Sequence, residues 1–271
     1  LATFPFPLGN QLAFWLALVL SLASIVFVAN LVDLDFPAVE PRPALRSTLA
    51  EVPRILRGHR DYRRYLEARA AMAAATGGVG FVVVAGLSGP LSGPDAAVLA
   101  GAVVLAQAVL GFGLGILGNR TGYRLVVVLG AGLIIIGMLI AALADSLPLF
   151  ALACALLGGA NALTFVCDPS MSIEFAPPGR TSVYLGTTLT LLAPFFIAAP
   201  LLAGLLVPVT GFVPVFVGCA VLAALGGVLA LRFRDPRRGG ALDEASPLGA
   251  EIASSPPHTA VRVPHTAEEA P

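Results

Sequence analysis

The stretch DAAVLAGAVVLAQAVLGFGLGILGNRTGYRLVVVLGAGLIIIGMLIAALA, residues 95–144, decides the fold of this chain. It holds two apolar runs, 95–117 and 124–144, separated by a short segment that carries Arg120. A membrane hydrocarbon core about 30 Å thick requires roughly 20 apolar residues per helix, and each run meets that length. Neither run shows the two-residue alternation of a membrane β-barrel. We therefore predict two membrane-spanning helices joined by a tight turn.

The same pattern continues along the rest of the 271-residue chain. Hydrophobic residues make up 57% of it and charged residues only 12%, with a mean hydropathy of +0.89, which leaves too little polar surface to cover a soluble globule. The predicted spans are 11–30, 66–88, 95–117, 124–144, 147–167, 183–207 and 211–232. The predicted fold class is all-α, a polytopic membrane helix bundle of about seven transmembrane helices.

Arginine predicts the orientation of this bundle. The chain has 16 basic residues apart from His, all of them Arg, and the segments between the apolar runs carry Arg in strict alternation. By the positive-inside rule, the Arg-bearing segments are cytoplasmic. An odd number of crossings then places the first residues outside. We expect a multi-pass protein of the cell inner (plasma) membrane, with its linker and C-terminal tail in the cytoplasm.

Composition divides the chain into four parts. Residues 1–30 form the first span, residues 31–65 a polar linker interrupted by prolines, and residues 66–232 a six-helix transmembrane half-bundle. Residues 233–271 are rich in Pro, Ala, Ser and acidic residues, which predicts a disordered cytoplasmic tail.

Two features of the linker region suit a membrane surface. Apolar residues recur at helical spacing, which predicts a helix lying on the cytoplasmic face, although a solvated linker with accidental periodicity is the alternative. These residues are Leu45, Leu49, Val52 and Leu56. Just before and inside the second span, long basic side chains are expected to anchor the helix by reaching toward lipid headgroups. They are Arg63, Arg64 and Arg69.

The most specific local motif is GILGNRTGYR, from Gly115 to Arg124. Two long helices must reverse direction here within about six residues, so glycine supplies backbone freedom and arginine holds the turn at the cytoplasmic face. The motif resembles a loop that the major facilitator superfamily repeats, and the matching residues are Gly115, Arg120, Gly122 and Arg124. Asn119 stands where the family prefers Asp, which weakens a charge-based contact, although an Asn can still accept hydrogen bonds from helix-terminal N–H groups.

The resemblance covers nearly the whole chain. One helix, a long basic linker, six further helices and the segment EFAPPGRTSVYLG, residues 174–186, look like the back half of such a transporter. On that resemblance, the spans correspond to family helices 6 to 12, and the chain, which begins at Leu1, is a fragment whose N-terminal half is missing. The implied partners are the lipid bilayer, a small-molecule substrate and that missing half.

The resemblance also implies alternating access, in which two six-helix halves rock about a site near the bilayer midplane. Polar side chains at that depth are the candidates for the substrate cavity, with Gln107 and Asn161 ahead of Thr187 and Thr190. For Gln107 and Asn161, a structural hydrogen bond between helices is the alternative to substrate contact. The expected function is secondary-active transport of a small solute, with drug or metabolite efflux preferred.

Further candidates concern gating. Pro194 and Pro200 interrupt the sixth span, and each removes a backbone donor, so kinks suited to a gating helix or to packing alone are expected. Asp168, Glu174 and Arg180 are candidates for a cytoplasmic gate in which the acids pair with Arg180; a solvated loop is the alternative.

Missing motifs exclude other chemistry. Without Lys there is no Walker-type phosphate loop, and no Cys or His cluster has metal-ligand spacing, so we expect no cofactor, no metal, no nucleic acid and no enzyme activity. No acid is expected at mid-span, which places any proton coupling in the missing helices or makes the protein a facilitator. Cys154, Cys167 and Cys219 are expected to be packing residues. A seven-helix receptor or regulatory membrane protein is the alternative function.

Overall fold

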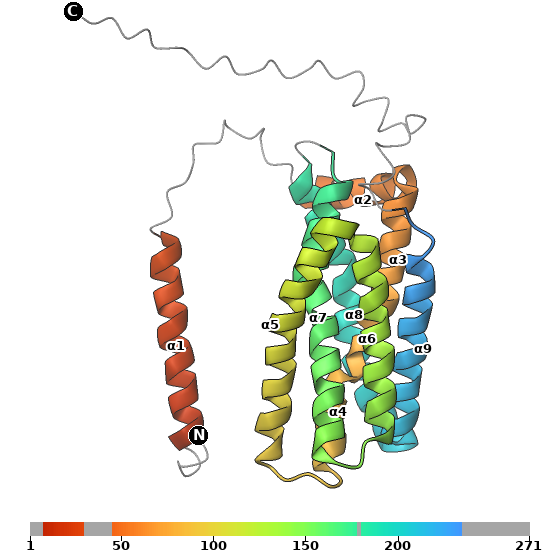
Figure 1. Cartoon of the computed structure of the whole chain (residues 1–271). Coiled ribbons are helices and arrows are strands. Elements are labelled where there is room, and N and C mark those ends of the chain that lie inside the picture. The colour runs from red at the N-terminus through yellow and green to blue at the C-terminus, as the bar shows by residue number, and fades with distance from the viewer. Residues whose placement is uncertain (1–7, 30–44, 178–179, 235–271) are drawn as a thin grey trace, which may run out of the picture.

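A computed structural model describes residues 8–29, 45–177 and 180–234, with side chains described over 14–27, 51–177 and 180–234. Helices account for the elements within these residues (Figure 1). They are α1 (Leu8–Ala29), α2 (Leu45–Gly58), α3 (Arg60–Ala75), the 3₁₀ turn η1 (Thr76–Gly78), α4 (Val79–Leu87), α5 (Asp95–Thr121), α6 (Tyr123–Leu143), α7 (Leu147–Phe175), α8 (Thr181–Thr210) and α9 (Phe212–Ala230).

Six helical stretches of the described chain are long and apolar enough to cross a membrane. They are α5 to α9 and the continuous span Arg60–Leu87, which joins α3, η1 and α4. A shorter apolar stretch, Phe14–Phe27, lies within α1. The predicted fold class, an all-α polytopic membrane bundle, is therefore confirmed. Two helices run well past the predicted spans: the second begins at Arg60, before residue 66, and the fifth extends to Phe175, beyond residue 167. The points at which they enter the membrane stay predictions.

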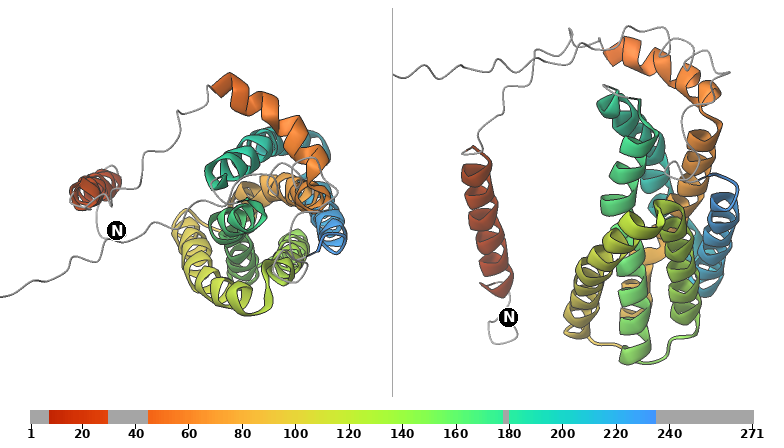
Figure 2. Two further views of the ribbon diagram at one scale, coloured as in Figure 1. Left: turned by 90° about the horizontal axis from the view of Figure 1, so that it is seen from above. Right: turned by 45° about the horizontal axis from the view of Figure 1, so that its top comes forward.

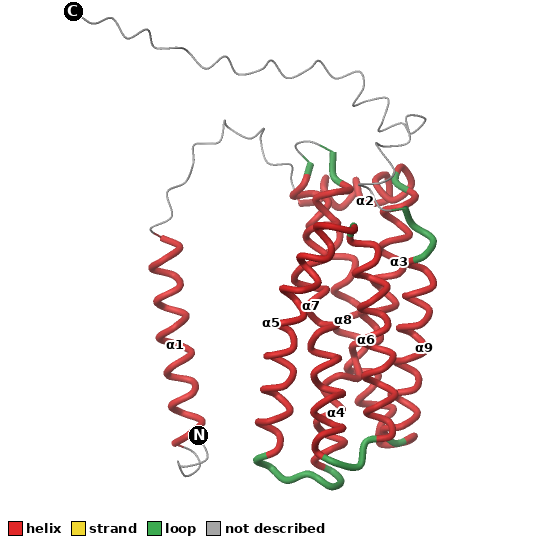
Figure 3. The backbone as a smooth tube through the Cα atoms, viewed as in Figure 1, coloured by secondary structure: helices red, strands yellow, loops and turns green. Residues whose placement is uncertain are grey.

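The helices pack in an order that differs from their order in the sequence. α7 packs between α5 and α6, α9 lies between α6 and α3, and α8 lies against α3 and η1 (Figure 2). α1 stands apart from this bundle in both Figures 1 and 2. Short loops join the spans at both ends (Figure 3). We call the end with Arg120, Arg180 and the start of α3 the arginine end.

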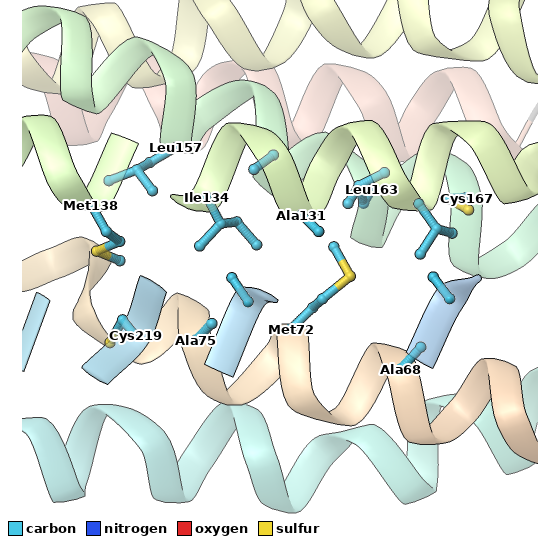
Figure 4. Packing of buried hydrophobic residues seen from close by; sticks show 14 of the residues in the cluster. Ala68, Met72, Ala75, Ala131, Ile134, Met138, Leu157, Leu163, Cys167 and Cys219 are labelled. Atoms are coloured by element: carbon cyan, nitrogen blue, oxygen red, sulfur yellow. The ribbon is translucent and has the colours of Figure 1, made fainter. Parts of the chain in front are cut away.

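Small and flexible apolar side chains fill the interior between α3, α6, α7 and α9. Met72, Ile134, Leu157 and Cys219 meet there from these four helices (Figure 4). Each is at most 7% exposed. The thiols of Cys154, Cys167 and Cys219 are all buried, as expected for packing residues.

The second span is not a uniform α-helix, because η1 interrupts it at a glycine pair. A Cβ atom placed on Gly77 would lie 2.6 Å from the carbonyl carbon of Ala199 in α8, so only glycine allows this approach. Gly80, three residues on, faces open space. The 3₁₀ turn therefore coincides with a close backbone approach between this span and α8.

α2 lies across the arginine end of the bundle (Figure 2). The helix predicted from apolar spacing in the linker is present; its position against a membrane surface stays a prediction. Ile55 is buried, and Glu51 forms an ion pair with Arg180, 3.7 Å between Oε1 and Nη2. Most of the predicted linker before α2, and the predicted disordered tail after residue 234, lie outside the described residues.

Candidate functional site

A buried ion pair joins α3 to α7. The Nη2 atom of Arg69 donates to Oδ2 of Asp168 at 2.8 Å, and its Nε donates to Oδ1 at 2.5 Å. The hydroxyl of Tyr65, one turn before Arg69, donates to Oδ1 at 2.6 Å. Arg69 is 2% exposed, and Asp168 and Tyr65 are fully buried. The two parallel N–H···O bonds fix the relative rotation of α3 and α7 more firmly than a single charge contact does.

Asp168 lies well inside its helix. α7 continues seven residues beyond it to Phe175, which is about 10 Å of helix at 1.5 Å per residue. Taking a carboxylate and a guanidinium out of water costs several kcal/mol each, and only good geometry with added hydrogen bonds offsets that cost. Tyr65 supplies one such bond, and Thr164 offers its Oγ1 at 3.4 Å from Arg69 Nη2.

Next to the ion pair, hydroxyl groups join three helices. Tyr62 on α3 contacts Thr188 Oγ1 on α8 at 2.8 Å and donates to the carbonyl of Tyr184 at 3.0 Å. Ser172 on α7 contacts the same Thr188 at 2.8 Å and donates to the carbonyl of Asp168 at 2.6 Å. The hydroxyl groups of Tyr62, Ser172 and Thr188 have three protons for these four contacts, so two of the contacts must share one proton. We call these residues, together with Tyr65, Arg69 and Asp168, the buried polar cluster.

His59, at the junction of α2 and α3, borders this cluster. Its ring meets Tyr184 edge-on, with ring centroids 5.6 Å apart. Its Nε2 is buried, and no group in the described part of the chain hydrogen-bonds to it. Burial without a compensating partner disfavours the charged imidazolium, so it lowers the pKa of His59 below its ordinary value of 6.5.

The turn between α5 and α6 is as tight as its sequence predicts. Gly122 adopts φ 95°, a left-handed conformation that favours glycine, and its N–H donates to Gly118 O at 2.9 Å. Asn119 accepts a bond from the Tyr123 hydroxyl at 3.1 Å. Arg124 does more than hold the turn, because its Nη2 donates to the carbonyl of Leu231 at 2.7 Å, just after α9.

Arginine thus binds the C-terminal end of α9 twice. Arg64 Nη1 donates to the carbonyl of Arg232 at 2.9 Å, beside the contact from Arg124. Carbonyls at a helix C-terminus have no partners within the helix and carry partial negative charge, so cationic donors are favoured there. These two contacts fasten α3, α6 and α9 together at the arginine end.

The Major Facilitator Superfamily sequence pattern matches residues 68–263 of the 271-residue chain. The chain belongs to the major facilitator superfamily. No curated protein matches the sequence at a significant level. Members of this superfamily are membrane transporters and generally not enzymes, so the expectation of a non-enzymatic membrane transporter is confirmed.

In this superfamily member, the two leading cavity candidates bind each other. Asn161 Nδ2 on α7 donates to Gln107 Oε1 on α5 at 3.2 Å, and both side chains are half-buried. The structural alternative weighed for this pair is therefore realised in this conformation, and substrate contact stays a prediction. Thr187 is buried, whereas Thr190 is exposed on α8.

Two expectations about charged residues were wrong. Asp168 does not pair with Arg180: its partner is Arg69, while Arg180 pairs with Glu51. Arg69 does not reach toward lipid headgroups, because the buried carboxylate holds it inside the bundle. Glu174 is half-buried on the last turn of α7. A gating role for Asp168, Glu174 and Arg180 stays a prediction.

The prolines of the sixth span lie inside a continuous helix. Pro194, Pro200 and Pro208 all fall within α8, and Pro200 follows the residue that Gly77 contacts. Their part in gating stays a prediction.

Sequence reasoning missed the buried polar cluster, although one signal for it was present. DYRRYLEAR, residues 61–69, places Tyr62, Tyr65 and Arg69 at intervals of three and four, which is one face of a helix. Tyrosines on the face that carries an arginine indicate a polar face turned inward. The contact between Arg69 and Asp168, 99 residues apart, has no local signal.

Proposed function

We propose that this protein is a secondary-active transporter that moves a small solute by alternating access. The observation that carries the proposal is a polar stripe on α7, flanked by two helices that are hardly buried. Only 11% of the most apolar stretch of α5 and of α8 is buried, against 50% for α7. α7 contacts both of these helices.

The polar stripe consists of residues at intervals of three, four and four, which share one face of α7. They are Asn161, Thr164, Asp168 and Ser172. Polar groups at membrane depth are costly against lipid and are favoured where they line a water-filled path or meet other polar groups. The half-buried Asn161 and Thr164 suit a path that opens between this half-bundle and a second one.

The exposed faces of α5 and α8 suit contact with that second half. Phe112 on α5 is 75% exposed and Leu205 on α8 is 72% exposed. The polar stripe lies on the helix between them. Rocking of two halves along such faces would open the stripe first to one side of the membrane and then to the other.

We propose that the protein lies in the cell inner (plasma) membrane and that its arginine end faces the cytoplasm. Arg120, Arg124, Arg180 and Arg232 all lie at this end, as the positive-inside rule requires of cytoplasmic loops. For the substrate, we propose a neutral or lipophilic solute. A polyanion would need several cationic groups in the cavity, and Arg69, the arginine deepest in the spans, is already bound to Asp168.

Vesicle transport tests the proposal. The chain, alone and together with any coding sequence that precedes it, is reconstituted in liposomes and screened for uptake and efflux of a panel of neutral, lipophilic, anionic and cationic solutes. Each solute is tested with and without a pH gradient. Saturable flux of a neutral or lipophilic solute supports the proposal.

The test variant is Thr190→Val, and its matched control is Thr210→Val. Both threonines are exposed on α8, but Thr190 lies within the helix, at the depth proposed for the cavity, and Thr210 is its last residue. Reduced flux only for Thr190→Val supports a cavity on this face. Absence of flux for every solute, in both forms of the chain, refutes the transport proposal.

A further inference from the structure

An exposed apolar stripe on α9 ends in an arginine. Val221, Leu225 and Val228 are 63%, 50% and 51% exposed, and their spacing of four and three residues places them on one face of the helix. Arg232 follows four residues later, just beyond the end of the helix, and is exposed as well. We call Val221, Leu225 and Val228 the α9 apolar stripe. The surface changes here from one suited to hydrocarbon to one that carries positive charge.

The α9 apolar stripe is turned outward from the bundle. The opposite face of α9 is buried against α3 and α6. α9 and α5 stand on opposite sides of the bundle in Figures 1 and 2, so the stripe lies away from the face of α5 on which a second half-bundle is proposed to pack. An apolar surface on a membrane-spanning helix, away from protein contacts, is a surface for lipid.

Three more arginines gather where α9 ends. Arg64 Nη1 donates to the carbonyl of Arg232 at 2.9 Å, and Arg124 Nη2 donates to the carbonyl of Leu231 at 2.7 Å. Because these carbonyls belong to consecutive residues, the guanidinium groups from α3 and α6 lie close to each other. Arg234 is exposed two residues further along the chain. We call Arg64, Arg124, Arg232 and Arg234 the α9 arginine cluster.

The α9 arginine cluster keeps a net positive charge. Of Arg64, Arg232 and Arg234, only Arg64 has an acidic partner within the described residues: Asp61 Oδ1 lies 3.6 Å from its Nη1, and both side chains are partly exposed. The sequence continues with DPRR at 235–238, which adds one acid and two arginines. The hydrogen bond to Arg232 uses one of the five N–H donors of the Arg64 guanidinium, so further donors remain for a ligand. The ligand that this charge attracts is an anion.

The length of the stripe matches one leaflet of a membrane. Val221 and Arg232 are 11 residues apart, which is about 17 Å at 1.5 Å per residue. Half of a hydrocarbon core about 30 Å thick is about 15 Å. A phospholipid whose acyl chain follows the stripe therefore has its phosphate at the level of the α9 arginine cluster.

We propose that the ends of α3, α6 and α9 form a binding site for an anionic phospholipid of the leaflet at the arginine end. Its phosphate contacts the α9 arginine cluster, because guanidinium groups bind phosphate oxygens through paired N–H···O bonds. One acyl chain follows the α9 apolar stripe. A net negative headgroup fits better than a zwitterionic one, whose own cation would lie among the arginines. The bound phosphate braces α3 and α6 against α9; this binding does not require transport, so the site goes beyond the proposed function.

Native mass spectrometry of the full chain in non-ionic detergent micelles measures the binding. The probes are phosphatidylglycerol and phosphatidylcholine with identical acyl chains. Each lipid carries one phosphate, but choline adds a fixed cation. Phosphatidylglycerol should bind more tightly by about fivefold or more. Equal affinity for the two lipids overturns the proposal.

The test variant is Arg232→Gln, which removes one charge and keeps the backbone carbonyl that Arg64 contacts. It should weaken the binding of phosphatidylglycerol about fivefold, which corresponds to the contribution of about 1 kcal/mol from one arginine near an anionic headgroup. The matched control is Arg120→Gln, which removes an exposed charge at the same end but from α5, a helix that packs mainly on α7. Equal losses in the two variants would assign the attraction to the arginine end as a whole and overturn the site.

Unfolding by added SDS separates lipid binding from folding. In micelles that contain phosphatidylcholine, Arg232→Gln should unfold at the same SDS fraction as the unchanged chain, because the Arg232 side chain has no partner among the described residues. Phosphatidylglycerol should raise the unfolding midpoint of the unchanged chain more than that of the variant. An identical rise in both overturns the proposed bracing of the helix ends.

A soluble competitor distinguishes a lipid from a free phosphate ester. Glycerophosphoglycerol has the headgroup of phosphatidylglycerol without its acyl chains. It should not displace the bound lipid at equal concentration, because it makes no contact with the α9 apolar stripe. Displacement would mean that a soluble phosphate ester occupies the site, and it would overturn the assignment to a lipid.

Discussion

The close approach of η1 to α8 gives the sharpest quantitative prediction. A Cβ on Gly77 would lie 2.6 Å from the carbonyl carbon and 2.9 Å from the carbonyl oxygen of Ala199. Optimal carbon–carbon contact is about 3.5 to 4.0 Å, so Gly77→Ala must displace α8 by about 1 Å. The Cβ of Ala199, at 2.5 Å, obstructs the site as well, and neither a Cβ nor a backbone carbonyl group can rotate away. Overpacking of this kind costs about 1 to 3 kcal/mol.

Gly80→Ala is the matched control, because Gly80 lies in the same span and faces open space. Replacing a helical glycine by alanine gains about 0.5 to 1 kcal/mol from backbone entropy, and both variants share that gain. The difference between their free energies of unfolding therefore isolates the packing cost, about 1 to 3 kcal/mol in favour of Gly80→Ala.

The assay is reversible unfolding of the full chain in mixed micelles by added SDS, followed by far-ultraviolet circular dichroism. Adding Ala199→Gly to Gly77→Ala should recover only part of the loss, because the carbonyl group of residue 199 remains in place. Equal stability of the Gly77→Ala and Gly80→Ala variants would show that the two helices do not approach as described.

Three further predictions use the same unfolding assay. Arg69→Leu should cost about 3 to 5 kcal/mol, because it leaves a buried carboxylate unpaired, and adding Asp168→Leu should recover most of that loss; an unrecovered double variant contradicts the desolvation argument. The pKa of His59 is lowered in the folded protein, so its contribution to stability is present above about pH 6.5 and is lost as pH falls below that value; His59→Phe should flatten this part of the pH profile, and an unchanged slope assigns it to other groups. Gln107→Leu and Asn161→Leu should each lower the free energy of unfolding by about 0.6 to 1.7 kcal/mol, and the double variant should lose less than the sum of the two. Strict additivity would mean that the two amides do not interact.

The sequence predicted the helices well because their signals are local. A run of about 20 apolar residues has a single favourable environment, and this property does not depend on the rest of the chain. The glycine and arginine spacing of residues 115–124 likewise predicted a tight turn, and Gly122 has the left-handed backbone that such a turn requires. The helices that begin at Arg60 and end at Phe175 run past the predicted spans for one reason: they continue through polar residues that are paired inside the protein.

The candidate site was predicted less completely because its contacts are not local. Gln107 and Asn161 were selected as polar groups at membrane depth, but only the packing of α5 on α7 shows that they bind each other, 54 residues apart. Arg69 was expected to anchor in lipid headgroups, since an arginine near a span end usually does. Nothing in the sequence around Arg69 indicates that it has a buried acidic partner 99 residues away.

Sequence by itself therefore determined that this chain is a bundle of membrane helices, which end carries the arginines, and which superfamily its turn motif resembles. Tertiary structure alone decided which polar groups meet. The rotation of each helix about its axis sets whether Asp168 faces lipid, a loop or Arg69, and that rotation is fixed by the close packing of neighbouring helices rather than by the residues adjacent in the chain.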